Sequence, residues 1–289
     1  MVNGVTAAKP APHPYGSSRT TEAVKRVLVE LGQVLGDYRG KFVVVGGNVP
    51  WLQIPDPVTA HIGSIDIDLA LDAEALAGGQ YKGLIDTLLA AGYQQPADGE
   101  VYQLARDVPS QDGGPPVRIL IDFLMPEHAV VKKNRPQLVP DFAVIPASGG
   151  DLALKFADKI LLEAEMPRGG LNQVELAVAS IPALLAMKGY ALVGRDKDKD
   201  AYDIYYCIRH YPGGIDALAT ACRPLMSSET ALKGFAGIAA KFQSREYTGP
   251  YAVRRFAAEE GILDDRDEDE WQTDAFGQVA AFLKAIGLR

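Results

Sequence analysis

The stretch Ser64-Ile-Asp-Ile-Asp-Leu-Ala-Leu71 decides the fold, because its residues alternate in polarity as the residues of a β-strand do. Side chains two apart on a strand share a face, so Asp66 and Asp68 point the same way while the apolar residues beside them face the core. Two neighbouring carboxylates repel each other, and one resists ionisation unless a cation lies between them. A hard divalent ion such as Mg²⁺ or Mn²⁺ resolves that conflict. The stretch therefore predicts a strand with two metal ligands.

A glycine turn precedes this strand in the chain. The β-rich run Lys41-Phe-Val-Val-Val45 ends in Gly46-Gly47, which predicts a buried strand followed by a tight turn. Glycines in such a turn let backbone N–H groups approach and hold phosphate oxygens. The side chain of Asn48 could add a further donor. Gly46, Gly47 and Asn48 are therefore candidate phosphate-binding residues, although a Gly-Gly turn alone is nearly uninformative.

A third acid lies in the apolar run Ile119-Leu-Ile-Asp-Phe-Leu124. Asp122 would be an edge or solvent-facing residue if it had no function. A carboxylate from a neighbouring strand is also what a second metal ion requires, since in a two-metal site one ion activates the attacking hydroxyl and the other holds a triphosphate. The order of strand, Gly-Gly turn, Asp-x-Asp strand and further acidic strand favours the functional interpretation over chance surface acids.

The remaining sequence predicts an α+β protein with a helical second half. Apolar spacing predicts a helix over 20–35, and the Gly- and Pro-rich loop between strands 101–106 and 117–124 predicts a hairpin. Residues 153–165 fit either a strand or a helix. Further helices are expected at 72–91, from Ser180 onward with Ser180 as the cap, at 197–210 and at 274–286. We expect a flexible segment at 1–19, an α/β core at 20–150 and a mostly helical domain at 151–289.

Composition is that of an ordinary globular chain, with 47% hydrophobic and 23% charged residues among 289. No apolar run reaches the length of a membrane span, and residues 1–18 lack a signal-peptide pattern. Cys207 and Cys222 show neither a disulfide framework nor metal-ligand spacing. We therefore expect a cytoplasmic protein without a membrane partner.

The net charge of −8 argues against a general nucleic-acid coat, because phosphate binding needs clustered cations. The charge is uneven, however. Basic residues gather over 188–199, which leaves room for a locally positive cleft. Lys132, Lys133 and Arg135 could steer an RNA or belong to a solvated loop. The acidic block over 259–270 is interpreted as a solvated stretch, or as one that repels nucleic acid or docks on the basic cleft.

Two cations and two acids in the second half form another constellation. Lys188 and Arg195 are seven residues apart and share a helix face. If Lys188 faced a triphosphate, it would neutralise charge that develops in the transition state. The alternative interpretation is that the Lys188 side chain packs its carbon chain on apolar neighbours and extends its amine to solvent. Asp200 and Asp203 are three apart on a helix and could hold Lys188 or Arg195 in place. With Lys199 beside them, they could equally form an exposed salt-bridged helix.

Several ring-bearing residues allow a binding or a structural interpretation. His61 could touch a nucleotide or be a solvated loop histidine. Tyr202, Tyr205 and Tyr206 could stack on a base, but aromatic residues at helical spacing more often pack in the core.

At this point the chain resembles the nucleotidyltransferase superfamily, whose fold is shared with DNA polymerase β. The resemblance rests on Val43-Val-Val-Gly-Gly-Asn48 and Ser64-Ile-Asp-Ile-Asp-Leu69. It implies a mixed sheet with flanking helices, followed by a helical domain. It also implies that Asp66, Asp68 and Asp122 bind metal, that Asp122 helps to deprotonate the acceptor, and that an NTP is the substrate.

A second match resembles the AbiEii/MenT group of toxin-type nucleotidyltransferases. It consists of 184–195 followed by Lys197-Asp-Lys-Asp-Ala-Tyr-Asp-Ile-Tyr-Tyr206. The group carries a lysine on a helix, then an arginine, then a Lys-Asp-x-x-Asp run. In this chain the lysine matches Lys188, the arginine matches Arg195, and the run matches Lys199, Asp200 and Asp203. The resemblance implies that Arg195 binds nucleotide, that the acceptor is RNA or tRNA, and that a cognate antitoxin exists. The rival interpretations are a small-molecule or protein acceptor, and a catalytically silent nucleotide-binding protein.

Overall fold

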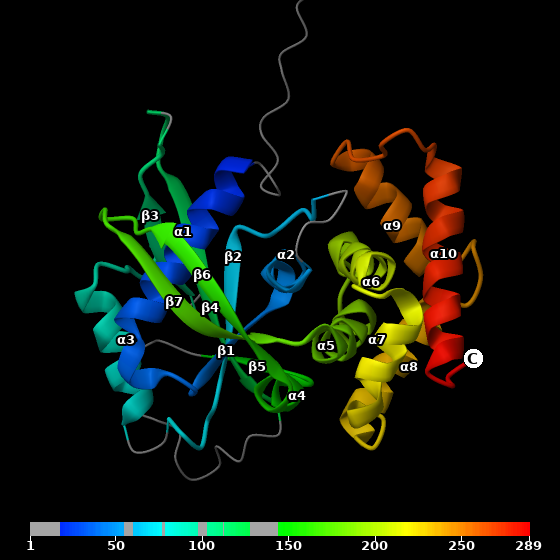
Figure 1. The fold of residues 1–289 in the computed structure, drawn as a ribbon, viewed down its shortest axis with the longest axis horizontal. Helices are drawn as coiled ribbons and strands as arrows, with labels where there is room; N and C mark the ends of the chain where they lie inside the picture. The colour runs from blue at the N-terminus through cyan, green and yellow to red at the C-terminus, as the bar shows by residue number, and fades with distance from the viewer. Residues whose placement is uncertain (1–17, 55–59, 77–78, 98–102, 112, 128–143) are drawn as a thin grey trace, which may run out of the picture.

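A mixed β-sheet forms one half of the molecule and a group of helices the other (Figure 1). The computed structural model describes residues 18–54, 60–76, 79–97, 103–111, 113–127 and 144–289. In those residues the sheet has seven strands in the order β3-β4-β2-β1-β7-β6, with β5 paired to β4. The strands are β1 Phe42–Val45, β2 Asp66–Leu71, β3 Gln103–Val108, β4 Val117–Pro126, β5 Ile145–Ala147, β6 Ala157–Glu165 and β7 Leu171–Ala179.

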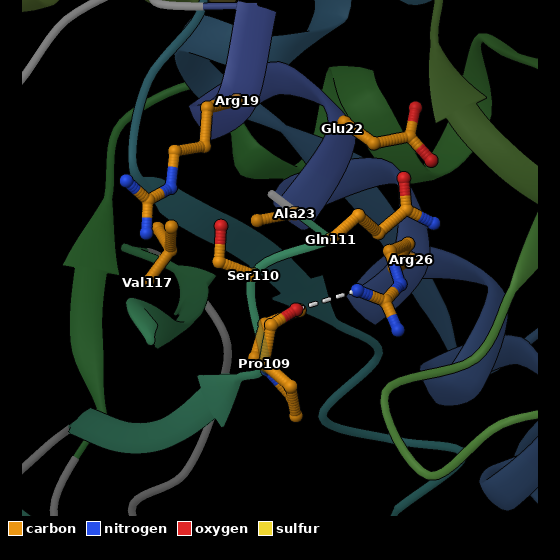
Figure 2. Close-up of a pocket in the computed structure, with 9 residues that line it drawn as sticks. Arg19, Glu22, Ala23, Arg26, Pro109, Ser110, Gln111 and Val117 are labelled. Carbon is orange, nitrogen blue, oxygen red and sulfur yellow. Dashed lines mark hydrogen bonds between the residues drawn. The ribbon is translucent and has the colours of Figure 1, made fainter. Parts of the chain in front are cut away.

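The sheet combines parallel and antiparallel pairs. β2 runs parallel to β4 and antiparallel to β1, while β3 and β4 form the expected antiparallel hairpin. Helix α1 (Ser18–Val34) packs on the sheet with the apolar stripe that its spacing predicts. In the middle of α1, the buried Arg26 donates to the carbonyl oxygen of Pro109 (Figure 2). It also donates to the carbonyl oxygens of Glu165 and Met166, and thus ties α1 to the ends of β3 and β6.

From Ser180 onward the chain is helical, as expected. α5 (Ile181–Gly194) begins at Ser180, whose side chain accepts from the Ala183 N–H, so the predicted cap is present. The helices that follow are α6 Asp198–His210, α7 Gly214–Cys222, α8 Glu229–Lys241, α9 Thr248–Glu259 and α10 Glu268–Ala285. α5 and α8 cross without intervening side chains, since a β-carbon on Gly234 would lie 2.3 Å from the Ala186 carbonyl oxygen.

Three boundaries differ from the sequence-based expectation. The helix expected over 72–91 starts only at α3 (Gln80–Ala90), because the Asp72 carboxylate caps a turn at Glu74 and Ala75 instead. The ambiguous run 153–165 divides between α4 (Gly150–Lys155) and β6. β7 was not expected, and it joins the sheet beside β1.

The sheet therefore continues to Ala179, beyond the expected domain boundary at residue 150. The change from sheet to helices falls at Ser180. Residues 1–17 of the expected flexible segment 1–19 lie outside the described residues. Its last two residues belong to α1, which begins at Ser18. Cys207 and Cys222 are buried free thiols. Over the described ranges, no helix has the length and apolarity to cross a membrane.

Candidate active site

A cleft of about 370 Å³ lies between the sheet and α5, and all three predicted acids line it. Asp66 and Asp68 come from β2, and Asp122 comes from β4. The two strands are parallel and Asp68 is the register partner of Asp122, so their side chains leave the same face of the sheet. Three acids that are distant in sequence thus meet on one wall.

The electrostatics of these acids reflect their crowding. Burial, and then repulsion by Asp122 and Asp66, raise the pKa of the Asp68 carboxyl to about 7. Burial also raises the pKa of Asp66, against the opposing attraction of Lys197 and Lys199. A cation among the three carboxylates would lower both pKa values, because it favours the ionised forms. The donor chemistry of this wall therefore fits a hard divalent ion.

The side chains do not form a closed metal cage as they stand. Among the residues that the structure describes, no three histidine, cysteine or acidic side chains have the spacing of a preformed metal cluster. Mg²⁺ does not require one, since it usually keeps several waters and takes one or two carboxylates together with substrate phosphates. Asp66, Asp68 and Asp122 are the residues that would hold it, and the ion would supply charge neutralisation at the phosphates.

The Gly46-Gly47 turn closes the cleft next to β2. It is the start of a short 3₁₀ segment, Gly46–Asn48, directly after β1. A β-carbon on Gly46 would meet the Asp68 carboxylate, and one on Gly47 would lie 3.1 Å from the Lys199 Nζ atom. The turn is therefore held between an acid and a lysine, with its backbone next to both.

Asn48 does not line the cleft. The side chain is buried; its amide nitrogen donates to the Asp66 carbonyl oxygen over 2.7 Å, and its oxygen accepts from Ser64 N–H and Trp51 Nε1. These bonds attach the glycine turn to the start of β2. The expected phosphate contact of the Asn48 side chain is thus replaced by contacts within the protein.

Lys188 faces the cleft from α5 and is nearly buried. Its Nζ atom lies 2.6 Å from Asp200 Oδ1 and 2.7 Å from Asp203 Oδ2. Burial alone would lower the pKa of Lys188, but the two carboxylates outweigh it and raise the pKa overall. Lys188 is therefore a firmly charged residue held by two acids, not a lysine that reaches out to solvent.

Lys199 shares Asp203 with Lys188. Its Nζ atom lies 2.7 Å from Asp203 Oδ1, and the side chain is almost fully buried on α6. Burial lowers the pKa of Lys199, and Asp203 offsets this only in part because Lys188 repels it. The alternative of an exposed salt-bridged helix is thus wrong for this part of α6: Asp200 and Asp203 are completely buried.

Arg195 follows α5 and binds the other acid. Its Nε and Nη2 atoms lie 2.7 and 2.9 Å from the two oxygens of Asp200. About half of the Arg195 side chain remains exposed at the cleft. Asp200 therefore orients both Lys188 and Arg195, as the spacing predicted.

His61 belongs to the same buried network. Its Nε2 atom lies 2.9 Å from Asp203 Oδ1, and its ring stacks on Tyr202. Burial lowers the pKa of His61 to about 4, so the ring is neutral at pH 7. Both expectations for His61, nucleotide contact and solvation, are wrong, because the loop before β2 places it behind the cleft.

The tyrosines of α6 pack in the core, as the helical spacing favoured. Tyr202, Tyr205 and Tyr206 are each at most 2% exposed. Sequence reasoning missed several uncharged residues that line the cleft without forming a motif. They are Pro146, Ala147 and Ser148 on and after β5, and Met187 and Tyr190 on α5.

Two charged segments remain. Lys132, Lys133 and Arg135 lie outside the described residues. The acidic block 259–270 spans the end of α9 and the start of α10, where Asp267 and Glu270 form a capping box. Asp264 pairs with Arg266, and Glu268 and Asp269 pair with Arg254. Local contacts therefore account for much of this block.

An acidic strand pair beside a glycine turn, faced by a buried lysine, is the arrangement of a nucleotidyltransferase. The family described as "Nucleotidyl transferase AbiEii toxin, Type IV TA system" matches residues 63–284. The match spans more than half of the chain, and the chain belongs to the AbiEii family of toxin–antitoxin nucleotidyltransferases. The predictions of the family and of the α+β nucleotidyltransferase fold are confirmed.

Solved structures with a similar fold are more distant. An antigenic nucleotidyltransferase-like protein from Paracoccidioides brasiliensis is 15% identical over 88% of this chain and 96% of its own, with a TM-score of 0.45. JHP933 from Helicobacter pylori is 11% identical over 93% of this chain and 94% of its own, with a TM-score of 0.49. No curated protein sequence matches this chain.

Proposed function

We propose that this nucleotidyltransferase transfers a nucleoside monophosphate from an NTP to a hydroxyl group of RNA, with tRNA as the target class and Mg²⁺ or Mn²⁺ as cofactor. One observation carries the proposal: Asp66, Asp68 and Asp122 line the same cleft as the Gly46-Gly47 turn. A divalent cation bound to the triphosphate would supply the positive charge that this acidic wall lacks. A toxin–antitoxin role of the family implies an antitoxin as the regulatory partner.

The proposed step is a displacement at the α-phosphorus. The acceptor oxygen forms a bond to the α-phosphorus, and the bond from that phosphorus to the bridging oxygen of the β-phosphate breaks. Pyrophosphate leaves, and the hydroxyl proton passes to the Asp122 carboxylate. The divalent ion would activate the hydroxyl and neutralise the triphosphate.

The chain's own residues would position the triphosphate. Backbone N–H groups of Gly46 and Gly47 donate to its oxygens, and the cations on the opposite wall balance its charge. Lys188 and Arg195 suit this task because Asp200 fixes the direction of both side chains. Asp203 and Lys199 support Lys188 from behind.

Labelling separates the acceptor classes. The protein is incubated with each radiolabelled NTP, Mg²⁺ and total RNA, and a parallel reaction contains a small-molecule and protein extract. We expect a labelled RNA band that Asp66→Ala reduces at least about a hundredfold. Asp86→Ala is the matched control, since this exposed acid pairs with Lys82 on the surface of α3.

Other outcomes would reject the proposal. Label on small molecules or proteins alone would assign a different acceptor. Metal-dependent NTP binding without turnover on any acceptor would indicate a silent binding protein. A cheap companion test is growth of a bacterial host that expresses the wild type or Asp66→Ala, where only the wild type should be toxic.

A further inference from the structure

A second hollow, of about 480 Å³, adjoins the cleft. It lies where the turn between α5 and α6 meets the end of α8 and the start of α9. Gly194, Arg195 and Lys197 line both the hollow and the cleft, so the two are continuous. A ligand that entered through the hollow would reach the carboxylate wall past these three residues.

The cations of this hollow outnumber its acids. Arg195, Lys197 and Lys241 line it together with Asp196 and Asp198. Arg255 on α9 binds both oxygens of Asp198, and Arg195 is paired with Asp200. Counting these pair partners, four cations face three carboxylates. Local positive charge beside the active site is notable in a chain whose net charge is −8.

Lys197 connects this charge to the active site. It lines the same cleft as Asp66, Asp68 and Asp122, so its side chain lies beside the acidic wall. Lys241, at the end of α8, lies on the far side of the hollow. The two lysines thus mark a basic path that leads toward Asp66.

Exposed aromatic rings border this path. Tyr247 and Tyr251 are 39% and 44% exposed, among the few large hydrophobic side chains that face solvent in the described residues. The Tyr251 ring centre lies 5.8 Å from the guanidinium of Arg255, which pairs with Asp198 in the lining of the hollow. Tyr247 precedes Thr248, another lining residue. The Arg254 guanidinium lies 4.7 Å from the Tyr251 ring centre, on the same helix. Aromatic faces interleaved with cations are the surface that binds single-stranded nucleic acid, by base stacking and phosphate contacts.

We propose that the hollow and the α9 tyrosines hold the single-stranded segment of the acceptor RNA that leads into the cleft. Tyr247 and Tyr251 stack on its bases, while Lys241 and Lys197 contact its phosphates. This inference rests on the proposed function and adds to it the surface that selects a polymeric acceptor. A small-molecule acceptor would need the cleft alone and would leave this surface without a role.

The test measures RNA binding separately from nucleotide binding. A fluorescently labelled single-stranded oligoribonucleotide is titrated with the protein, and its anisotropy is followed at several salt concentrations. We expect Tyr251→Ala to weaken RNA binding about tenfold, the effect of one lost stacking contact, and Tyr251→Trp to retain it. We expect Lys241→Ala to weaken binding and to lower the salt slope by about one, and Lys241→Arg to retain both.

Controls separate this surface from the catalytic site. Lys233→Ala removes an exposed lysine of the same helix that pairs with Glu229, and it should bind RNA like the wild type. NTP affinity, measured by calorimetry, should be unchanged in Tyr251→Ala and Lys241→Ala. Thermal melting checks that each variant folds, which is expected because both side chains are at the surface.

The outcomes distinguish the inference from the proposed function. If the wild type labels RNA while Tyr251→Ala and Lys241→Ala bind and label it equally well, the inference is wrong and the proposed function stands. If the wild type neither binds nor labels RNA, both are wrong. A rise in the KM for RNA at constant KM for NTP, in both variants, supports the inference.

Discussion

The Asp68 carboxylate lies against Gly46, so closely that a β-carbon at Gly46 would be 1.8 Å from Asp68 Oδ2. Gly46 also has a φ angle of 76°, in the left-handed region that favours glycine. Glycine is thus needed here both for the backbone conformation and for the close approach. The glycine turn after β1 and the acidic strand β2 are consequently one structural unit.

Replacing Gly46 should therefore damage both stability and transfer. We expect Gly46→Ala to lower the free energy of unfolding by roughly 2–4 kcal/mol, since backbone strain and overpacking add, and to reduce transfer at least about a hundredfold. Gly40→Ala is the matched control: Gly40 has φ 80° and nothing near its missing β-carbon. It should lose only about 1–2 kcal/mol and keep its activity. Urea unfolding measures stability and labelling measures transfer. If Gly46→Ala and Gly40→Ala lost equal stability and equal activity, the close contact between Gly46 and Asp68 would be contradicted.

Asp203 compensates two buried lysines and accepts from a neutral histidine, so its charge should be essential for folding. We expect Asp203→Asn to destabilise the protein by about 3–5 kcal/mol, because Lys199 then has no buried counter-charge. Asp86→Asn, which breaks the exposed pair with Lys82, should change stability by less than about 1 kcal/mol. Chemical denaturation measures both values. A small effect at Asp203 would mean that water replaces its contacts.

The raised pKa of Asp68 predicts a pH-dependent stability. The folded-state pKa of about 7 lies above the ordinary carboxyl value, so the unfolded chain ionises first as pH rises. Without divalent metal, this group should therefore reduce the free energy of unfolding progressively from about pH 4 to pH 7, by an amount on the order of 4 kcal/mol. Above pH 7 the loss in the free energy of unfolding should stay constant, because Asp68 is then ionised in both the folded and the unfolded state.

Asp68→Asn isolates this contribution. In the absence of divalent metal the variant should become more stable than the wild type as pH rises, and the difference should be largest at pH 8. Added Mg²⁺ should raise the melting temperature of the wild type at pH 8 and leave that of Asp68→Asn nearly unchanged. Parallel pH profiles of the two proteins would show that Asp68 ionises normally.

The crossing of α5 and α8 depends on Gly234. We expect Gly234→Ala to destabilise the protein by about 1–3 kcal/mol, because its β-carbon would collide with the Ala186 carbonyl and push α5 away. The shift should also raise the KM for NTP, since α5 carries Lys188. Gly277→Ala, in an open part of α10, should instead stabilise by about 0.5–1 kcal/mol. Opposite signs in the two melting curves are the expected result.

Local patterns were enough to identify several features. The alternation in 64–71 predicted β2, and the run 41–45 predicted β1 and its glycine turn. The polar cap at Ser180 predicted where α5 begins. These features depend on residues close in sequence, whose propensities act before any tertiary contact forms. The spacing of Asp200 and Asp203 put both acids on one helix face and allowed either a contact with Lys188 or Arg195 or an exposed salt-bridged helix; the structure shows the contact with Lys188.

The sequence by itself thus determined which strands and helices carry the acids and the lysine. Only the tertiary structure decided that Asp68 and Asp122 share a register, that β6 and β7 complete the sheet, and that Asn48 and His61 turn inward. The physical reason is that these features depend on strand pairing and side-chain burial between segments that are far apart in the sequence. The spacing of neighbouring residues carries no information about which distant backbone a strand or side chain will meet.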